Sequence, residues 1–175
     1  TLPQIEFSAG DNGVALVFRH MEPLSASDQE KLTGFCRDLG WQCYLQPGNY
    51  STVHRVWPLD GEDRLSYDFP DFNLTLHFHP LDFTQVNAAI NRQMVKLAID
   101  MLNPQPNERI LDLFCGLGNF TLPIARLGAR VHGFEGSQAL VDRARENAER
   151  NGLAASCEFG VANLFEVTAD SFAAL

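Results

Sequence analysis

Strand-like and helix-like segments alternate along the second half of the chain. Runs of apolar residues predict strands over 109–114, 129–134 and 156–161, and helical spacing predicts helices over 119–127 and 138–151. Strands that alternate with helices form a parallel sheet with helices packed on it. We therefore expect an α/β fold, the first half of a Rossmann-like sheet, with ligands bound beyond the carboxyl ends of its strands.

An amphipathic helix is expected just before this sheet, over residues 86–102, because apolar residues recur there at helical spacing. The apolar positions that indicate this helix are Val86, Ala89, Ile90, Met94, Leu97, Ala98, Met101 and Leu102. Three strands follow, whereas a doubly wound sheet has roughly six. We therefore expect a fragment of a longer protein, in which the strand over 110–114 has an unpaired edge through which copies could self-associate.

The residues before this helix predict a separate, small α+β region. Its strands are expected over 41–45, 64–69 and 72–78, in addition to a hairpin nearer the start of the chain. We place the domain boundary near Pro80, so that residues 1–80 form the α+β region and residues 81–175 form the truncated second domain.

The start of the chain carries turn and cap signals. Alternating apolar residues predict a hairpin over 5–18, and we expect Asn12 and Gly13 to supply positive φ angles in its turn. A helix then begins after a serine cap, which is either Ser25 or Ser27.

Charge and cysteine content exclude several classes of protein. The chain has 22 acidic and 13 basic residues, and 12 of the acidic but only 5 of the basic residues lie before residue 85. This balance argues against a surface that wraps a phosphate backbone. No apolar run approaches the ~20 residues of a membrane span, so we expect a soluble, cytoplasmic protein without a membrane partner. The four cysteines form no C-x-x-C pair, so neither a zinc ribbon nor a disulfide framework is expected.

A glycine loop follows the first strand of the predicted sheet. Gly116 and Gly118 would let a ligand approach the backbone, and Glu135, 19 residues after Gly116, could accept both ribose hydroxyls of a nucleoside. Thr121 stands where a dinucleotide fold has its third glycine, which disfavours a pyrophosphate and favours S-adenosylmethionine. Asn119 either caps the following helix or contacts the ligand.

Several segments carry a more specific resemblance. Residues 82–87 (DFTQVN), 111–123 (LDLFCGLGNFTLP) and 146–152 (ENAERNG) resemble the RNA uracil carbon-5 methyltransferase family. Residues 19–25 (RHMEPLS) and 28–32 (DQEKL) are most similar to its bacterial 23S ribosomal RNA branch. The resemblance implies an S-adenosylmethionine-dependent enzyme whose RNA partner is 23S rRNA.

The resemblance also implies which residues hold S-adenosylmethionine. Gln85, which could otherwise be an ordinary exposed residue at a helix start, would reach the methionine end of the cofactor. Asn163, which could otherwise be a plain loop residue, would face the adenine. The implied cofactor-binding set is Gln85, Phe114, Gly116, Gly118, Asn119, Glu135 and Asn163.

In this family a cysteine thiolate adds to carbon 6 of uracil, carbon 5 takes the methyl group, and a base removes the carbon-5 proton. The resemblance places that cysteine and that base beyond Leu175, so we expect no catalytic residue in this chain and no activity from it alone. Cys115, inside the glycine loop, is expected to be a packing residue. The family branch also carries a 4Fe-4S cluster, which we expect upstream of Thr1, so no metal site is expected here.

Three alternatives remain open. The first is a transfer RNA uracil methyltransferase with the same chemistry. The second is a nicotinamide-dependent oxidoreductase, which the missing third glycine disfavours. The third is a non-catalytic module that only binds S-adenosylmethionine.

Overall fold

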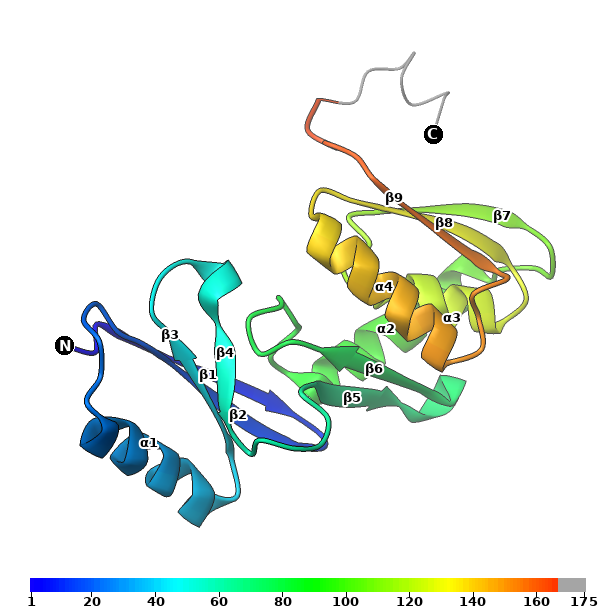
Figure 1. Ribbon diagram of the computed structural model, residues 1–175. Coiled ribbons are helices and arrows are strands. Elements are labelled where there is room, and N and C mark those ends of the chain that lie inside the picture. The colour runs from blue at the N-terminus through cyan, green and yellow to red at the C-terminus, as the bar shows by residue number, and fades with distance from the viewer. Residues whose placement is uncertain (167–175) are drawn as a thin grey trace. The chain divides into compact units, whose positions relative to one another are not determined.

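The structure, a computed structural model, describes residues 1–166 (Figure 1). The end of the predicted second domain, residues 167–175, lies outside the described residues. The chain folds into two compact units. The first contains Thr1–Tyr67 and His77–Asp82, and the second contains Asp68–Leu76 and the residues from Phe83 onward. The division runs through a two-stranded sheet of β5 and β6, and the chain leaves the first unit for the last time close to Pro80.

The first unit is built on a four-stranded sheet with the order β1-β2-β3-β4. The β1–β2 and β3–β4 pairs are antiparallel, whereas β2 and β3 are parallel and are joined through α1. The elements up to the hairpin that the two units share are β1 (Gln4–Gly10), β2 (Gly13–Arg19), α1 (Ala26–Leu39), β3 (Gln42–Gln46), β4 (His54–Trp57), β5 (Leu65–Phe69) and β6 (Leu74–Phe78). The α+β character and the strands predicted for this region are confirmed.

The turn between β1 and β2 differs from the expected Asn-Gly turn. Gly10 pairs with Gly13, so Asp11 and Asn12 form the loop, and Asn12 does not have a positive φ. The Asn12 side chain instead bonds a distant segment: its Oδ1 accepts from the backbone N–H of Ser66 at 2.7 Å and its Nδ2 donates to the carbonyl of Arg64 at 3.2 Å. These contacts fix the loop, and the prediction for Asn12 was wrong because such long-range partners leave no local sequence signal.

Helix α1 has well-defined ends. Ser25, rather than Ser27, is the N-cap, and its hydroxyl accepts from the backbone N–H of Asp28 at 3.1 Å. Gly40 ends the helix in the left-handed conformation, with a φ of 69°.

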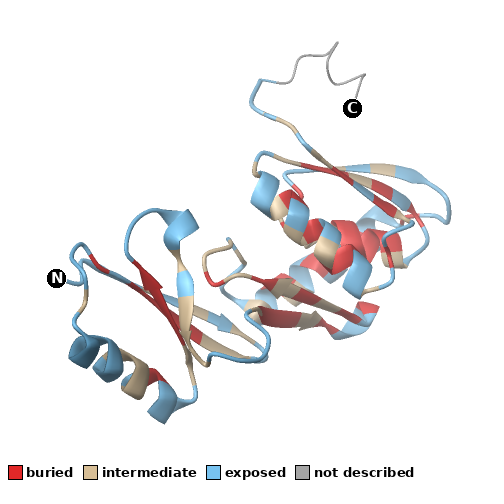
Figure 2. Ribbon diagram, in the orientation of Figure 1, coloured by how far each residue is buried: buried red, intermediate tan, exposed pale blue. Residues whose placement is uncertain are grey.

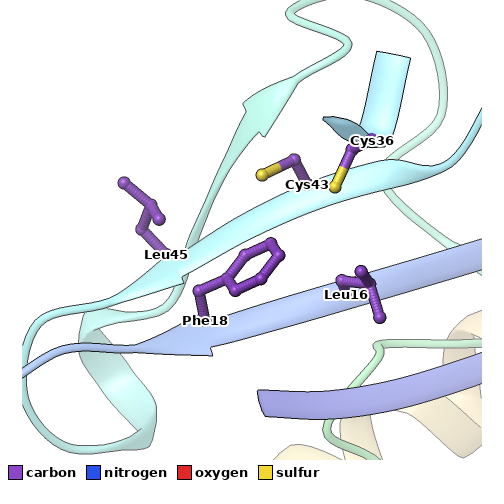
Figure 3. Close-up of a cluster of buried hydrophobic side chains, with 5 residues drawn as sticks. All are labelled: Leu16, Phe18, Cys36, Cys43 and Leu45. Atoms are coloured by element: carbon purple, nitrogen blue, oxygen red, sulfur yellow. The ribbon is translucent and has the colours of Figure 1, made fainter. Parts of the chain in front are cut away.

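Helix α1 packs on the sheet through a small apolar cluster (Figure 3). Cys36 comes from the helix and Cys43 from β3, and both are fully buried. The other members are Leu16, Phe18 and Leu45. Burial raises the pKa of both thiols, that of Cys43 to about 12. These two cysteines are therefore core residues.

The second unit contains a parallel sheet with the order β7-β8-β9. Helices α3 and α4 pack on this sheet, and Figure 2 shows α3 as a buried helix. The elements are α2 (Ala88–Leu102), β7 (Arg109–Leu113), α3 (Thr121–Arg126), β8 (Arg130–Glu135), α4 (Gln138–Arg150) and β9 (Cys157–Val161). The predicted α/β alternation is confirmed, and β7 forms one edge of the sheet within the described residues.

The helix predicted before the sheet is confirmed as α2, but the apolar positions that indicated it are not its buried positions. Its buried residues are Asn91, Val95 and Ile99, which lie four residues apart on one face. Most of the apolar residues that indicated the helix are exposed: Val86, Ile90, Met94, Leu97, Met101 and Leu102. The helix is apolar on more than one face, so periodicity alone could not select the face that packs.

None of the helices within residues 1–166 is both long and apolar enough to cross a membrane.

Candidate cofactor-binding site

The glycine loop, residues 114–120, connects the carboxyl end of β7 to the start of α3. Three of its residues have left-handed backbone conformations: Phe114, Gly116 and Gly118, with φ angles of 62°, 56° and 101°. A Cβ on Gly116 would meet open space, whereas one on Gly118 would lie 3.1 Å from Cγ of Leu122. Gly116 therefore lets a ligand approach the backbone, and Gly118 allows the loop to pack on α3.

Glu135 ends β8 beside this loop. Its Oε2 accepts a hydrogen bond from the backbone N–H of Gly116 at 3.1 Å. Its Oε1 accepts from the backbone N–H groups of Gly136 at 2.7 Å and of Ser137 at 3.3 Å. The carboxylate is thus held at the carboxyl edge of the sheet, next to the open space at Gly116, where the spacing along the sequence predicts it.

Phe114 also lies at this edge, and 54% of its surface is exposed. A left-handed phenylalanine is strained, and such strain concentrates at functional sites. Its ring centroid lies 5.4 Å from that of Phe165. Asn163 belongs to the same segment after β9, and its Oδ1 accepts from the backbone N–H of Phe165 at 3.3 Å. The loop and the segment after β9 therefore meet at this edge.

Asn119 does not cap α3. The N-cap position is Phe120, which makes no side-chain cap hydrogen bond. The amide of Asn119 forms a reciprocal pair with buried Asn91 of α2, at 2.9 Å and 3.1 Å. These hydrogen bonds hold the loop against α2. Asn119 therefore positions the loop, a role that we did not predict from the sequence.

Thr121 occupies the position at which a dinucleotide-binding loop has its third glycine, and its side chain has a structural role there. It is fully buried, and its hydroxyl donates to Oδ2 of Asp112 at 2.5 Å. Burial raises the pKa of Asp112, and the hydrogen bonds from Thr121 oppose this shift. A threonine hydroxyl thus satisfies a buried carboxyl beneath the loop, a role that glycine could not fill.

Asn147 of α4 is a third positioning residue that sequence reasoning missed. It is fully buried, and its Nδ2 donates to the carbonyl of Leu117 at 3.1 Å. Asn91 and Asn147 share one structural feature, since each is a buried amide on the packed face of a helix, and burial leaves no local signal in the sequence.

Gln85 is exposed in the segment before α2. No hydrogen bond within residues 1–166 joins it to Glu135 or to the glycine loop. The hydrogen bond between Asn91 and Asn119 nevertheless brings the first turns of α2, which follow Gln85, to the loop.

Cys115 is a packing residue, as expected. It is 4% exposed, and a Cβ on Gly133 of β8 would lie 2.9 Å from its Sγ. Burial, followed by the nearby carboxylates of Asp112 and Glu135, raises the pKa of its thiol to about 12. Within residues 1–166, no group of three or more His, Cys, Asp or Glu side chains could hold a metal ion.

Comparisons with known proteins identify relatives of this chain. The 23S rRNA (uracil(1939)-C(5))-methyltransferase RlmD of Alcanivorax borkumensis is 60% identical over 152 residues, which are 87% of this chain and 34% of the relative. RlmD of Aromatoleum aromaticum is 52% identical over 174 residues, 99% of this chain and 40% of the relative. The chain thus spans two fifths or less of the length of these relatives.

A solved structure shares the fold. The Pyrococcus abyssi tRNA (uracil-54, C5)-methyltransferase, in complex with S-adenosyl-L-homocysteine, matches with a TM-score of 0.67 and 22% identity, over 93% of this chain and 40% of that one. The model of the tRNA (uracil-5-)-methyltransferase family matches residues 67–158, more than half of the chain. The resemblance seen in the sequence is confirmed, including the similarity to the bacterial 23S rRNA enzymes: the chain belongs to the tRNA (uracil-5-)-methyltransferase family.

Proposed function

We propose that this chain is the S-adenosylmethionine-binding part of an enzyme that methylates carbon 5 of a uridine in 23S rRNA. The observation that carries the proposal is the glycine loop bonded to Glu135, in a chain whose relatives are named as enzymes of that activity. Both relatives are bacterial 23S rRNA enzymes, and this favours ribosomal over transfer RNA as the substrate.

The residues at the sheet edge fit S-adenosylmethionine, which supplies an electrophilic methyl group when bound. Open space at Gly116 allows close approach, and the cofactor has no phosphate that would need a longer glycine cradle. Glu135 would hold the ribose hydroxyls and the exposed Phe114 ring would cover an apolar part of the cofactor. Gln85, Asn119 and Asn163 are assigned to the same site through the family resemblance.

This chain supplies no nucleophile in our proposal. Attack on carbon 6 of uracil needs a thiolate, which forms readily only when the pKa of the thiol is lowered. All four thiols are buried and have raised pKa values: Cys36, Cys43, Cys115 and Cys157. We therefore assign the thiolate and the base to segments of the parent enzyme outside this chain, and we assign the 4Fe-4S cluster to the parent as well.

Two alternatives are disfavoured by specific observations. A nicotinamide-dependent oxidoreductase needs a loop that cradles a pyrophosphate, but here Thr121 is buried against Asp112 in place of the third glycine. The second alternative is a module that only binds the cofactor, which would be consistent with a chain that has no uracil nucleophile. The relatives that match most of this chain are, however, named as methyltransferases, so we place the chain within such an enzyme.

Transfer of a labelled methyl group tests the substrate. The complete protein that contains this chain is incubated with tritiated S-adenosylmethionine and either unmodified 23S rRNA or unmodified transfer RNA. We expect label at carbon 5 of uridine in 23S rRNA and none with this 175-residue chain alone. Label in transfer RNA alone would overturn the assignment of the substrate, and activity of the isolated chain would overturn the assignment of the nucleophile.

A further inference from the structure

A pocket of about 310 Å³ lies in the first unit, where the loop after β2 meets the end of β3. The parallel strands β2 and β3 end at the same edge, with Arg19 opposite Gln46. Crevices beyond the carboxyl ends of parallel strands are common ligand sites. The loop that lines the pocket is the RHMEPLS segment, to which the proposed function gives no role.

Two histidines line this pocket, and a backbone carbonyl near each ring determines which ring nitrogen carries the proton. Nδ1 of His20 lies 2.8 Å from the carbonyl oxygen of Glu22, and Nδ1 of His54 lies 3.0 Å from that of Thr52. A carbonyl only accepts, so each Nδ1 carries the proton and each Nε2 of the neutral ring is an acceptor. Within residues 1–166 the hydrogen bonds of both rings use Nδ1 and none uses Nε2, so two acceptors remain for a ligand.

The remaining walls indicate the chemistry of that ligand. The carboxylate of Glu22, whose Oε2 lies 3.7 Å from the N-terminal ammonium of Thr1, adds a third acceptor, while Leu45 and Pro47 supply apolar surface. The first 84 residues carry 12 acidic and 5 basic side chains, so the ligand would be held through a base rather than through a phosphate. A flat ring with exocyclic N–H donors fits this lining, because the ring can stack on the apolar side chains and its N–H groups can donate hydrogen bonds to the acceptors.

We propose that this pocket binds an unpaired nucleobase with an amino group, that is adenine, cytosine or guanine, from the RNA that the enzyme methylates. The RNA source rests on the proposed function, whereas the pocket chemistry does not. Proteins read single-stranded RNA in this way, by stacking unpaired bases and bonding their edges. The pocket would select bases of the RNA strand that carries the target uridine.

Nuclear magnetic resonance of the histidine rings of this chain tests the proposal. Unstructured oligomers of adenosine, cytidine or uridine are added, and S-adenosylhomocysteine is added in a separate arm. We expect the Nε2 resonances of His20 and His54 to shift with the adenosine and cytidine oligomers and much less with the uridine oligomer. Equal shifts with all three, or no shift at all, would overturn the proposal.

This experiment distinguishes failure of the pocket proposal from failure of the proposed cofactor site. If S-adenosylhomocysteine alone moved the two histidine rings, the pocket would belong to the cofactor adenine and the RNA assignment would fall. If that ligand bound nowhere while the adenosine oligomer still moved the rings, the cofactor part of the proposed function would fail and the pocket would stand.

A variant series adds a quantitative test. His54 is exposed, so His54→Ala is expected to fold and to weaken binding of the adenosine oligomer about 3- to 10-fold, the loss of one hydrogen bond. His132→Ala, a histidine of β8 outside the pocket, is the matched control and should leave that affinity unchanged. Equal affinities of His54→Ala and the unaltered chain would contradict the proposal.

Discussion

Glu135 and Gly116 are 19 residues apart in the chain, yet the carboxylate of one accepts the backbone N–H of the other at 3.1 Å. This contact joins the end of the second parallel strand to the glycine loop after the first. It sets the acid beside the backbone that a nucleoside ligand would approach.

Loss of the Thr121 hydroxyl should destabilise the fold beneath this loop. Thr121→Val keeps the volume of the side chain but removes the donor to the buried Asp112 carboxyl. We expect the free energy of unfolding to fall by about 1–3 kcal/mol. Urea denaturation measures it, and Thr121→Ser, which keeps the hydroxyl, should lose clearly less. Equal losses for the two variants would show that the hydrogen bond is not the cause.

The pH dependence of stability should carry a contribution from Asp112. Burial raises its folded-state pKa above the ordinary value of 3.8, so the folded state binds more protons than the unfolded state between these two pKa values. This contribution is present below pH 3.8 and is lost as the pH rises through the folded pKa.

Asp112→Asn has no titrating carboxyl at this position, so it should not lose stability as the pH rises through the folded-state pKa of Asp112. The free energy of unfolding of Asp112→Asn, relative to that of the unaltered chain, should therefore rise as the pH increases from 3.8 through that pKa. Asp38→Asn, at an exposed position of α1, is the control and should leave the slope unchanged. Urea denaturation at a series of pH values measures both, and an unchanged slope in Asp112→Asn would refute the assignment.

A matched pair of alanine variants tests which face of α2 is packed. Ile99 is 3% exposed and Leu97 is 61% exposed. Ile99→Ala should lower the free energy of unfolding by about 2–5 kcal/mol, whereas Leu97→Ala should change it by no more than about 0.5 kcal/mol. A larger loss in Leu97→Ala than in Ile99→Ala would show that the packed face of α2 is the one that carries Leu97.

Helix α2 also shows where sequence reasoning stops. Most strands and helices were predictable because apolar alternation, a serine cap and helix-ending residues are local signals, but β4 was not predicted. Contacts between distant positions were not predictable. Asn119 bonds Asn91, 28 positions away, and Asn12 bonds Ser66, 54 positions away. The packed face of α2 likewise depends on residues outside the helix. Glu135 was predictable because its place at the end of a strand follows from spacing in the α/β repeat.

The four thiols should resist alkylation in the folded chain. Burial raises the pKa values of Cys43, Cys115 and Cys157 to about 12, so very little thiolate forms at neutral pH. We expect iodoacetamide to react at least about 100-fold more slowly than with the chain unfolded in urea. Mass spectrometry follows each cysteine, and rapid modification of Cys115 in the folded state would make it a candidate nucleophile.

Calorimetric titration of the chain with S-adenosylhomocysteine tests the central claim most directly. We predict binding of one equivalent, weakened by at least about 10-fold in Glu135→Ala because the ribose hydroxyls lose a charged acceptor. Glu158→Ala, an exposed acid on β9, should bind as the unaltered chain does. A folded chain that binds no S-adenosylhomocysteine, or that binds reduced nicotinamide cofactor at the Glu135 site instead, would contradict the account.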